Sequence, residues 1–311
     1  MTGTAVLGTG HYLPPLVERL GVTRPIEVVP PGTSELGARA GRAALASAGL
    51  SASDLDFLVF ATINPDVTFP GSACFLQEKL ECDTVGALDI RAQCAGFVFA
   101  LSVAEQFVRC GVYRRVLVVG GELHSVWVDY SSGGAELARR FGDGAGALVL
   151  GPGDGGTGVL GTVLHTDGSR YDRFWCEYPA SRHHPLRIGP EDIREGRHYP
   201  KMQEEEVRRF GSTALPQVIR EAAERASIDL ARVDRFVIAH VFPDVAQRAG
   251  KELGVEERVV NPSDRYGHLG AAALPLALSI EISEGRIGSG DLVCLAAAGA
   301  GFAWGAALLR L

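Results

Sequence analysis

The 311-residue sequence has only two methionines and three tryptophans, and it has fewer basic than acidic residues. Its six cysteines include no Cys-X-X-Cys pair and lie mostly in apolar stretches, which argues against a zinc site or a disulfide framework. The net charge of −7 argues against nucleic acid or an anionic membrane as the main partner. These absences favour a globular protein of a reducing compartment.

Long apolar runs are also missing. No stretch reaches membrane-spanning length without glycine, proline or charge, and the N-terminus has no basic region followed by an apolar core. The glycine-rich run GDGAG at residues 142–146 does not have the Gly-X-Gly-X-X-Gly spacing of a dinucleotide site. We therefore expect a cytoplasmic protein that is not embedded in a membrane and that uses no cofactor or metal.

Helix and strand patterns alternate along the chain. Apolar strands are predicted at residues 4–9, 57–62, 85–90, 116–119 and 142–150, and helices at residues 34–49, 70–80 and 95–110. Residues 11–33 are rich in proline and are predicted to be an irregular surface crossing. The alternation predicts a layered α/β fold.

The second half of the sequence repeats the first. LDFLVFATINPDV at residues 55–67 matches VDRFVIAHVFPDV at residues 233–245, and VLVVGG at 116–121 matches LVCLAAAG at 292–299, both at an offset of 178. Between them, Cys94 lies opposite the start of GHLGAAALPLAL at an offset of 174, and three matches in the same order favour an internal duplication. We place the boundary between two halves, 1–156 and 157–311, in a glycine-rich stretch.

Cys94 is the candidate nucleophile. It lies at a sharp turn between a strand and a long apolar helix, where free backbone N–H groups and the helix dipole favour a thiolate and can hold an oxyanion. The alternative is that Cys94 is one more small buried apolar residue.

Two histidines stand out by position. His240 directly follows a predicted strand, and His268 lies opposite Cys94 in the repeat, at the start of GHLGAAALPLAL. Equivalent strand ends of two α/β halves meet at the centre of such a molecule, so we expect Cys94, His240 and His268 to converge. The other histidines are assigned structural or surface roles: His11, His124, His165, His183, His184 and His198.

Several motifs together resemble the thiolase-fold condensing enzymes, and most closely the β-ketoacyl-acyl-carrier-protein synthase III family. These are GTGHYLP, FATINPDVTFPGSA, LDIRAQCAGFVFALSVAEQFV, RRFGDGAGALVL, the histidine at 240 and the C-terminal GAGFAWGAALLRL. The resemblance implies a five-layer αβαβα fold, a homodimer and acyl transfer from a thioester to Cys94. It also implies that Phe69 crosses to the partner's acyl pocket and that Ala300, with Cys94, supplies the oxyanion-hole N–H groups.

The sequence departs from the family pattern at three places. His268 stands where synthase III enzymes usually have asparagine, and Val241 to Asp244 replace the usual Gln-Ala-Asn that follows the catalytic histidine. Residues 15–31 contain no tryptophan to hold the adenine of coenzyme A, and the second arginine expected before Phe141 falls near Ala135. An acyl carrier protein is therefore favoured over acyl-coenzyme A as donor.

Further site residues follow from this interpretation. Phe69, Phe141 and Met202 are candidates for the acyl pocket. A basic rim for an acidic carrier is predicted at Arg208, Arg209, Arg248 and Lys251, with Arg139 and Arg140 behind it, although such residues are often simply solvated.

Three functions stay open at this point. The first is loading of an acyl group on Cys94 followed by decarboxylative Claisen condensation, with His240 and His268 as donors to the enolate oxygen. The second is transfer of the acyl group from Cys94 to a hydroxyl or amine, with His240 as general base. The third is a catalytically silent subunit, against which the presence of all three residues argues.

Overall fold

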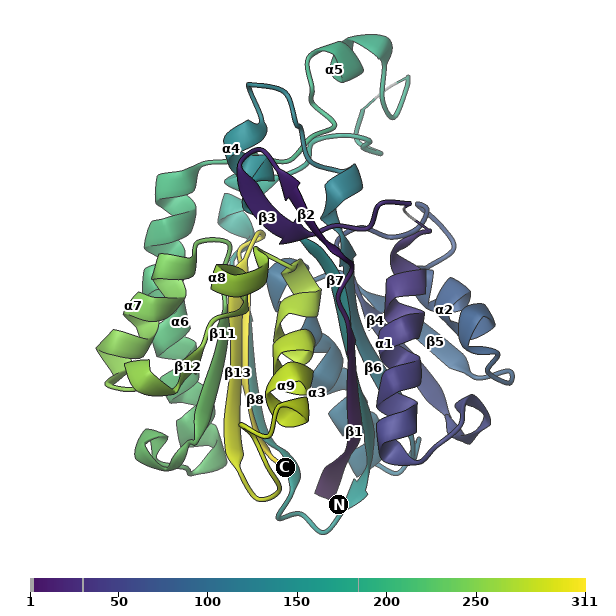
Figure 1. Ribbon diagram of the computed structural model, residues 1–311, viewed down its shortest axis with the longest axis vertical. Helices are drawn as coiled ribbons and strands as arrows, with labels where there is room; N and C mark the ends of the chain where they lie inside the picture. Colours follow the sequence, from purple (N-terminus) through teal and green to yellow (C-terminus); the bar gives the residue numbers. More distant parts are fainter. Residues whose placement is uncertain (1–2, 30, 184) are drawn as a thin grey trace.

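Two five-stranded sheets, with helices between them and on both outer sides, make up the chain (Figure 1). The computed structural model describes residues 3–29, 31–183 and 185–311. The first sheet has the strand order β1 (Gly3–Tyr12), β7 (Asp143–Gly153), β6 (Val116–Leu123), β4 (Phe57–Ala61), β5 (Gly86–Ile90). The second has the order β8 (Gly158–Thr166), β14 (Ala303–Arg310), β13 (Leu292–Gly299), β11 (Arg235–Ala239), β12 (Val259–Val260).

The two sheets have the same connectivity. In each, three neighbouring strands pair in parallel, and the other two strands pair antiparallel with their neighbours. β1, β4, β5, β6 and β7 correspond in chain order to β8, β11, β12, β13 and β14. The first sheet uses residues up to Gly153 and the second begins at Gly158.

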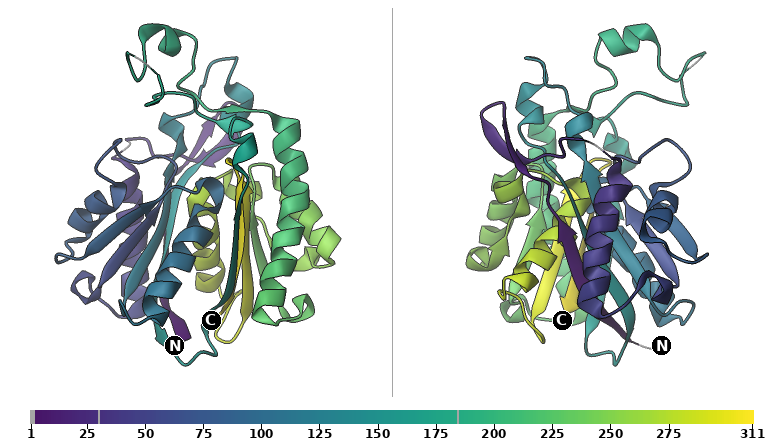
Figure 2. Two further views of the ribbon diagram at one scale, coloured as in Figure 1. Left: turned by 180° about the vertical axis from the view of Figure 1, so that it is seen from behind. Right: turned by 45° about the vertical axis from the view of Figure 1, so that its right-hand side comes forward.

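Helices form three layers around the sheets. α1 (Thr33–Ala48) and α2 (Ser72–Leu80) cover the outer face of the first sheet, and α6 (Glu204–Ala226) and α7 (Pro243–Leu253) cover that of the second. α3 (Gly96–Arg109) and α9 (Ala273–Ser283) lie between the sheets (Figures 1 and 2). This is the five-layer αβαβα arrangement that the family resemblance implies.

α9 is apolar on nearly all sides because both sheets surround it. Its sequence, ALPLALSIEIS, has only three polar side chains, and its residues from Ala273 to Glu281 are buried. A helix without a polar face is typical of the interior of a large protein. The central apolar core therefore lies between the sheets, with a further core on the outer side of each.

A β-hairpin stands where the sequence predicts an irregular crossing. β2 (Leu16–Arg19) pairs with β3 (Val22–Pro25) across the two residues Leu20 and Gly21, which have φ values of 55° and 74°. A two-residue turn with two positive φ angles is the favoured hairpin geometry, but Leu-Gly is not its usual sequence signal. The sequence therefore does not predict a hairpin at these residues.

Short elements lie over the carboxyl ends of the parallel strands. They belong largely to residues 171–203 at the top of Figure 1, which contain β9 (Phe174–Trp175), α5 (Pro190–Arg194) and β10 (Lys201–Met202). Two more short helices are α4 (Ala135–Ala138) and α8 (Pro262–Tyr266). Among the described residues, no helix combines the length and apolar character needed to cross a membrane.

The contact of β7 with α9 gives a first prediction. A Cβ on Gly146 would lie 2.1 Å from the backbone nitrogen of Leu276, and backbone cannot move aside as a side chain can. We expect Gly146→Ala to lower the free energy of unfolding by at least about 2 kcal/mol, because overpacking forces the helix away from the sheet. Urea unfolding measures the change.

Gly168→Ala is the matched control, since a Cβ there meets nothing within 4 Å. Equal stabilities of the two variants would contradict the predicted backbone contact.

Candidate active site

Cys94 lies at the entrance to the central helix α3. It belongs to a short 3-10 helix, Gln93–Ala95, that leads directly into α3. Gln93 has φ 52°, a left-handed conformation that is uncommon for a side-chain-bearing residue. Gly270, which starts the short helix Gly270–Ala272 ahead of α9, has φ 50°. The structural counterpart of Cys94 is thus Ala271, and His268 lies two residues before this turn rather than opposite Cys94.

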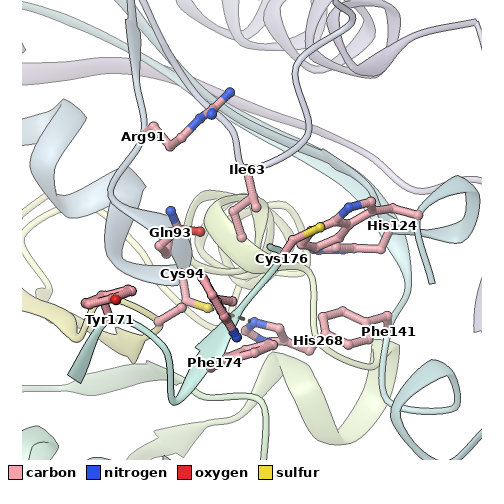
Figure 3. Close-up of a pocket in the computed structure, with 14 residues that line it drawn as sticks. Ile63, Arg91, Gln93, Cys94, His124, Phe141, Tyr171, Phe174, Cys176 and His268 are labelled. Carbon is pink, nitrogen blue, oxygen red and sulfur yellow. Dashed lines mark hydrogen bonds between the residues drawn. The ribbon is translucent and has the colours of Figure 1, made fainter. Parts of the chain in front are cut away.

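The thiol of Cys94 contacts the imidazole of His268. Sγ lies 3.0 Å from Nε2, and both side chains are buried (Figure 3). The backbone N–H groups of Ala300 and of Cys94 itself donate toward the sulfur and lower the pKa of the thiol. Burial and the nearby Glu122 carboxylate raise it more strongly, to about 12.

The resting thiol is therefore neutral, in contrast to the thiolate that the helix position alone predicts. Loss of hydration in the buried site outweighs the two N–H donors and the helix terminus. Burial also lowers the pKa of His268 well below its usual value, so its ring is neutral too. The S–H accordingly donates to Nε2 of His268.

Backbone hydrogen bonds fix the position of His268. Its N–H donates to the carbonyl of Arg140 at 2.6 Å, and its carbonyl accepts from the N–H of Gly142 at 3.2 Å. Nε2 accepts from the thiol, so the ring proton is on Nδ1, for which the described residues offer no acceptor. The ring can take a second proton from Cys94 without breaking another contact.

A glycine makes room for the thiol. A Cβ on Gly299, at the end of β13, would lie 2.4 Å from Sγ and 2.6 Å from Cβ of Cys94. The last strand of the second parallel set thus passes directly over the thiol, and the chain continues from there to Ala300. This close approach places the Ala300 N–H beside the sulfur.

His240 directly follows β11, as predicted, and its ring is buried against α6. Its Nδ1 accepts from the backbone N–H of Phe242 at 3.2 Å, and Nε2 lies against Gly211 of α6. His240 is not among the described residues that line the cavity. It is close enough for its charge to affect the pKa of His268. Cys94 and His268 thus meet as expected, and His240 lies near His268 without being among the described lining residues, so its part in the site stays a prediction.

A second imidazole in the cavity comes from His124, which the sequence analysis assigned a structural role. Its ring centroid is 6.2 Å from that of His268 and 4.7 Å from that of Phe141. Nδ1 donates to the carbonyl of Gly142 at 3.0 Å, and Nε2 lies 3.8 Å from Oε2 of Glu122. Burial lowers the pKa of His124 to about 4.

Glu122 is the buried carboxyl behind this ring. It accepts from the backbone N–H groups of Ile63 at 3.0 Å and Ala271 at 3.1 Å, and burial raises its pKa to about 8. Glu122 and His124 lie at the end of the buried strand β6. Glu122 and His124 therefore carry the same sequence signal as His240, a polar residue at the end of a buried apolar strand.

The cavity at Cys94 has a volume of about 300 Å³. Its described lining residues are Ile63, Arg91, Gln93, Cys94, His124, Trp127, Phe141, Tyr171, Phe174, Trp175, Cys176, His268, Ala300 and Gly301. Phe141 thus lines the cavity as predicted. Met202 is not among them; it lies on β10 and packs against the core on the outer side of the second sheet. Phe69 is 81% exposed and also lies outside the cavity of its own chain.

The predicted basic rim is largely neutralised. Asp244 pairs with both Arg208 and Arg248, and Glu206 pairs with Arg209. Behind them, Arg139 and Arg140 pair with Glu136 and Glu204. Lys251 has no acidic partner among the residues described. These side chains are therefore not a surface of uncompensated positive charge.

Two family models match parts of this chain. The family model of 3-oxoacyl-[acyl-carrier-protein] synthase III matches residues 88–168, and the model of its C-terminal part matches residues 223–311. β-Ketoacyl-[acyl-carrier-protein] synthase III of Thioalkalivibrio sulfidiphilus is 35% identical over the whole length of both chains. The Mesorhizobium japonicum enzyme of the same name is 37% identical, over 95% of this chain and 90% of its own.

Solved structures are similar over the same length. The 3-oxoacyl-[acyl-carrier-protein] synthase III of Aquifex aeolicus has a TM-score of 0.88 and 29% identity, covering 99% of this chain and 100% of its own. The priming β-ketosynthase of the R1128 polyketide pathway has a TM-score of 0.88 and 27% identity, covering 100% and 96%. The likeness extends through both halves of the fold.

Burial of His240 predicts a pH dependence of stability. Its pKa is lowered from 6.5 to about 4 in the folded protein, so the stability gained from the neutral ring is complete above pH 6.5 and is lost as the pH falls toward 4. We expect the wild type to lose roughly 2 to 3 kcal/mol more than His240→Asn between pH 8 and pH 4.5. Urea unfolding at the two pH values measures this difference, and an equal loss in both proteins would contradict it.

Proposed function

The chain belongs to the β-ketoacyl-[acyl-carrier-protein] synthase III family, and we propose that it loads an acyl group on Cys94 and extends it by decarboxylative Claisen condensation. One observation carries the assignment of the nucleophile. Sγ of Cys94 lies 3.0 Å from a neutral imidazole and beside two backbone N–H donors, at a cavity large enough for an acyl chain.

The first step is acyl transfer. Sγ of Cys94 attacks the carbonyl carbon of a thioester while its proton moves to Nε2 of His268. The N–H groups of Cys94 and Ala300 stabilise the oxyanion. The tetrahedral intermediate then expels the donor thiolate, which takes the proton from His268. A buried thiol with a raised pKa needs such a base, and His268 is in contact with it.

The second step is condensation. A malonyl thioester loses its carboxylate as carbon dioxide, and the electron pair of the broken C–C bond forms an enolate. The enolate carbon attacks the acyl-Cys94 carbonyl, the new C–C bond forms, and Cys94 leaves as a thiolate.

His268 is one donor to the enolate oxygen: acylation frees Nε2 from the thiol, and the ring proton then moves from Nδ1 to Nε2. For the second donor we retain His240, whose Nδ1 accepts from the N–H of Phe242 and whose proton is therefore on Nε2. His124 also lines the cavity, and it can donate only once its proton leaves Nδ1, which donates to Gly142 in the resting site.

Acyl transfer to a hydroxyl or amine is the less favoured function. That reaction needs a base next to the acceptor, which was assigned to His240. The ring of His240 faces α6, and its Nδ1 lone pair is already used by the N–H of Phe242. The curated relatives cited above are both named as synthases.

We further propose that an acyl carrier protein delivers the substrates to the face formed by α6 and α7. Arg209 and Arg248 are 67% and 70% exposed there, although each also contacts a carboxylate. Their carboxylate partners limit the contribution of charge to docking, which we expect to be modest and sensitive to salt. That the protein acts in the cytoplasm remains a prediction.

The test of this function is intact-protein mass spectrometry. We expect acetyl- or longer acyl-pantetheine and acyl-carrier thioesters to add one acyl group to the wild type and none to Cys94→Ala. His268→Ala should slow the addition by roughly 100-fold or more, because the neutral thiol loses its base. Addition of malonyl carrier protein should then remove the acyl group and release carbon dioxide and a β-keto thioester.

The companion variants separate the two remaining histidines. His124→Ala and His240→Ala should leave acylation near the wild-type rate, and the variant lacking the second enolate donor should lose condensation by roughly 100-fold. An acyl-Cys94 that persists with malonyl carrier protein but is removed by an amine or alcohol would replace condensation by acyl transfer. Absence of any adduct would exclude both.

We also propose a homodimer built on the edge of the first sheet. β5 is an edge strand with a free hydrogen-bonding side, and Phe69, Val67 and Leu88 are exposed apolar residues near this edge. An exposed edge with apolar side chains favours pairing with a second copy. Phe69 is then available to line the partner's acyl pocket, as the family resemblance implies.

Phe69→Asp tests this assembly. We expect the charge to weaken the dimer, with the molar mass from light scattering falling toward that of one chain, and to slow acylation by long acyl groups more than by acetyl. Val112→Asp is the matched control, because Val112 is an exposed apolar residue in the turn after α3. A wild-type mass equal to one chain, or equal masses of the two variants, would overturn the proposal.

A further inference from the structure

The cavity at Cys94 adjoins a second one. The second cavity has a volume of about 410 Å³, and four residues line both: Ile63, Arg91, Trp127 and Cys176. Its remaining walls come from the loop after β4, from Val126, and from the segment that contains Tyr178 and Pro179. An acyl group attached to Cys94 can therefore extend past Arg91 into a further space.

Two arginines, Arg91 and Arg187, line this second cavity, and its described lining includes no aspartate or glutamate. Neither arginine has an ion pair or a side-chain hydrogen bond within the described part of the chain. This differs from the arginines of α6 and α7, which pair with carboxylates. Both arginines are exposed, and two like charges at one cavity attract an anion from solvent.

Carboxylates close in sequence to the lining residues already have other partners. Asp66 accepts from the N–H and the hydroxyl of Ser34 at 3.1 and 2.7 Å, and Asp89 accepts from the N–H groups of Ser72 and Ala73, both at 2.7 Å. Glu177 lies 3.9 Å from Nε2 of His183. None of these described carboxylates pairs with an arginine of the cavity.

The direction of Arg91 relative to Cys94 indicates where the anion lies. Arg91 is three residues before the nucleophile, and in Figure 3 its guanidinium points away from the thiol, beyond Gln93. An anion bound there lies at the end of the acyl group remote from the thioester. A bidentate guanidinium is suited to a carboxylate.

We propose that Arg91 and Arg187 bind the terminal carboxylate of a dicarboxylic acyl group whose thioester carbonyl lies at Cys94. The inference rests on the proposed function, since it names the acyl substrate class of the same site. In the acylation step the thioester bond of the donor breaks, the Cys94 thioester forms, and the donor leaves as a thiol.

The malonyl extender is the other source of a carboxylate. Its carboxylate is lost next to the acyl-Cys94 carbonyl, whereas Arg91 points away from the thiol. An ion pair to that carboxylate would also stabilise the ground state and slow its loss. Both arguments favour the acyl chain.

The experiment compares acyl groups of equal chain length with and without the terminal charge. Glutaryl- and pentanoyl-pantetheine are offered to the full-length protein, and the rate of addition to Cys94 is followed by intact mass. Pantetheine avoids any dependence on the adenine of coenzyme A. We expect glutaryl transfer to exceed pentanoyl transfer in the wild type, and Arg91→Met to reduce the glutaryl rate by roughly 10- to 100-fold. The ratio of glutaryl to pentanoyl transfer should fall accordingly.

Arg187→Met should have the same selectivity effect, and Arg114→Met is the matched control. Arg114 is an exposed arginine before β6 that uses only its backbone N–H in a hydrogen bond to Asp56. Arg114→Met should keep the wild-type ratio of glutaryl to pentanoyl transfer.

The outcomes separate this inference from the proposed function. Pentanoyl transfer that equals or exceeds glutaryl transfer, with no change in Arg91→Met, overturns the carboxylate site and leaves the acyl enzyme intact. Loss of carbon dioxide release from malonyl carrier protein in Arg91→Met, with an unchanged glutaryl rate, assigns the arginine to the extender and also overturns it. Failure of both thioesters to acylate Cys94 refutes the proposed function itself.

Discussion

The direct backbone contact between the two halves is the constraint on which the rest of the structure depends. Gly96 at the start of α3 faces Ala271, and Gly120 of β6 lies under the carbonyl of Ala271. Side chains larger than these would separate the sheets, because the interior is close-packed. The same contact brings Cys94 of one half within 3.0 Å of His268 of the other. A shared interior built from small residues therefore brings together the two side chains at the centre of the candidate site.

Burial sets the chemistry of that site. The helix entrance and two N–H donors favour a thiolate at Cys94, yet the loss of water and the charge of Glu122 raise the thiol pKa to about 12. His268, His124 and His240 are likewise held neutral by burial. The resting site thus holds no charge pair, and in the proposed mechanism proton transfer to His268 accompanies attack on the substrate. For the reactivity of Cys94, contact of its thiol with a base therefore matters more than the fraction of the thiol that is ionised.

Charge is distributed unevenly around the cavity. The α6 and α7 face is balanced by Asp244 and Glu206, whereas Arg91 and Arg187 face a cavity lined by no described carboxylate. A net charge of −7 makes this pair of cations more notable, since most of the surface provides acidic partners. Uncompensated charge near the nucleophile is a feature of substrate recognition more often than of folding.

Local sequence determined much of this protein. The helix and strand pattern and the repeat predicted the layered α/β fold and singled out Cys94, whereas Phe141 was selected through the family resemblance. The repeat placed His268 opposite Cys94, but in the structure Ala271 is the counterpart, and His268 reaches the thiol from two residues before that turn. Only the tertiary structure decided which side chains meet. The ring of His240 packs against α6, His124 and Glu122 lie at the site, and Met202 lies outside the described lining of the cavity. Side-chain direction at a strand end depends on the packing of distant residues such as Gly211 and Gly142, which local sequence does not specify.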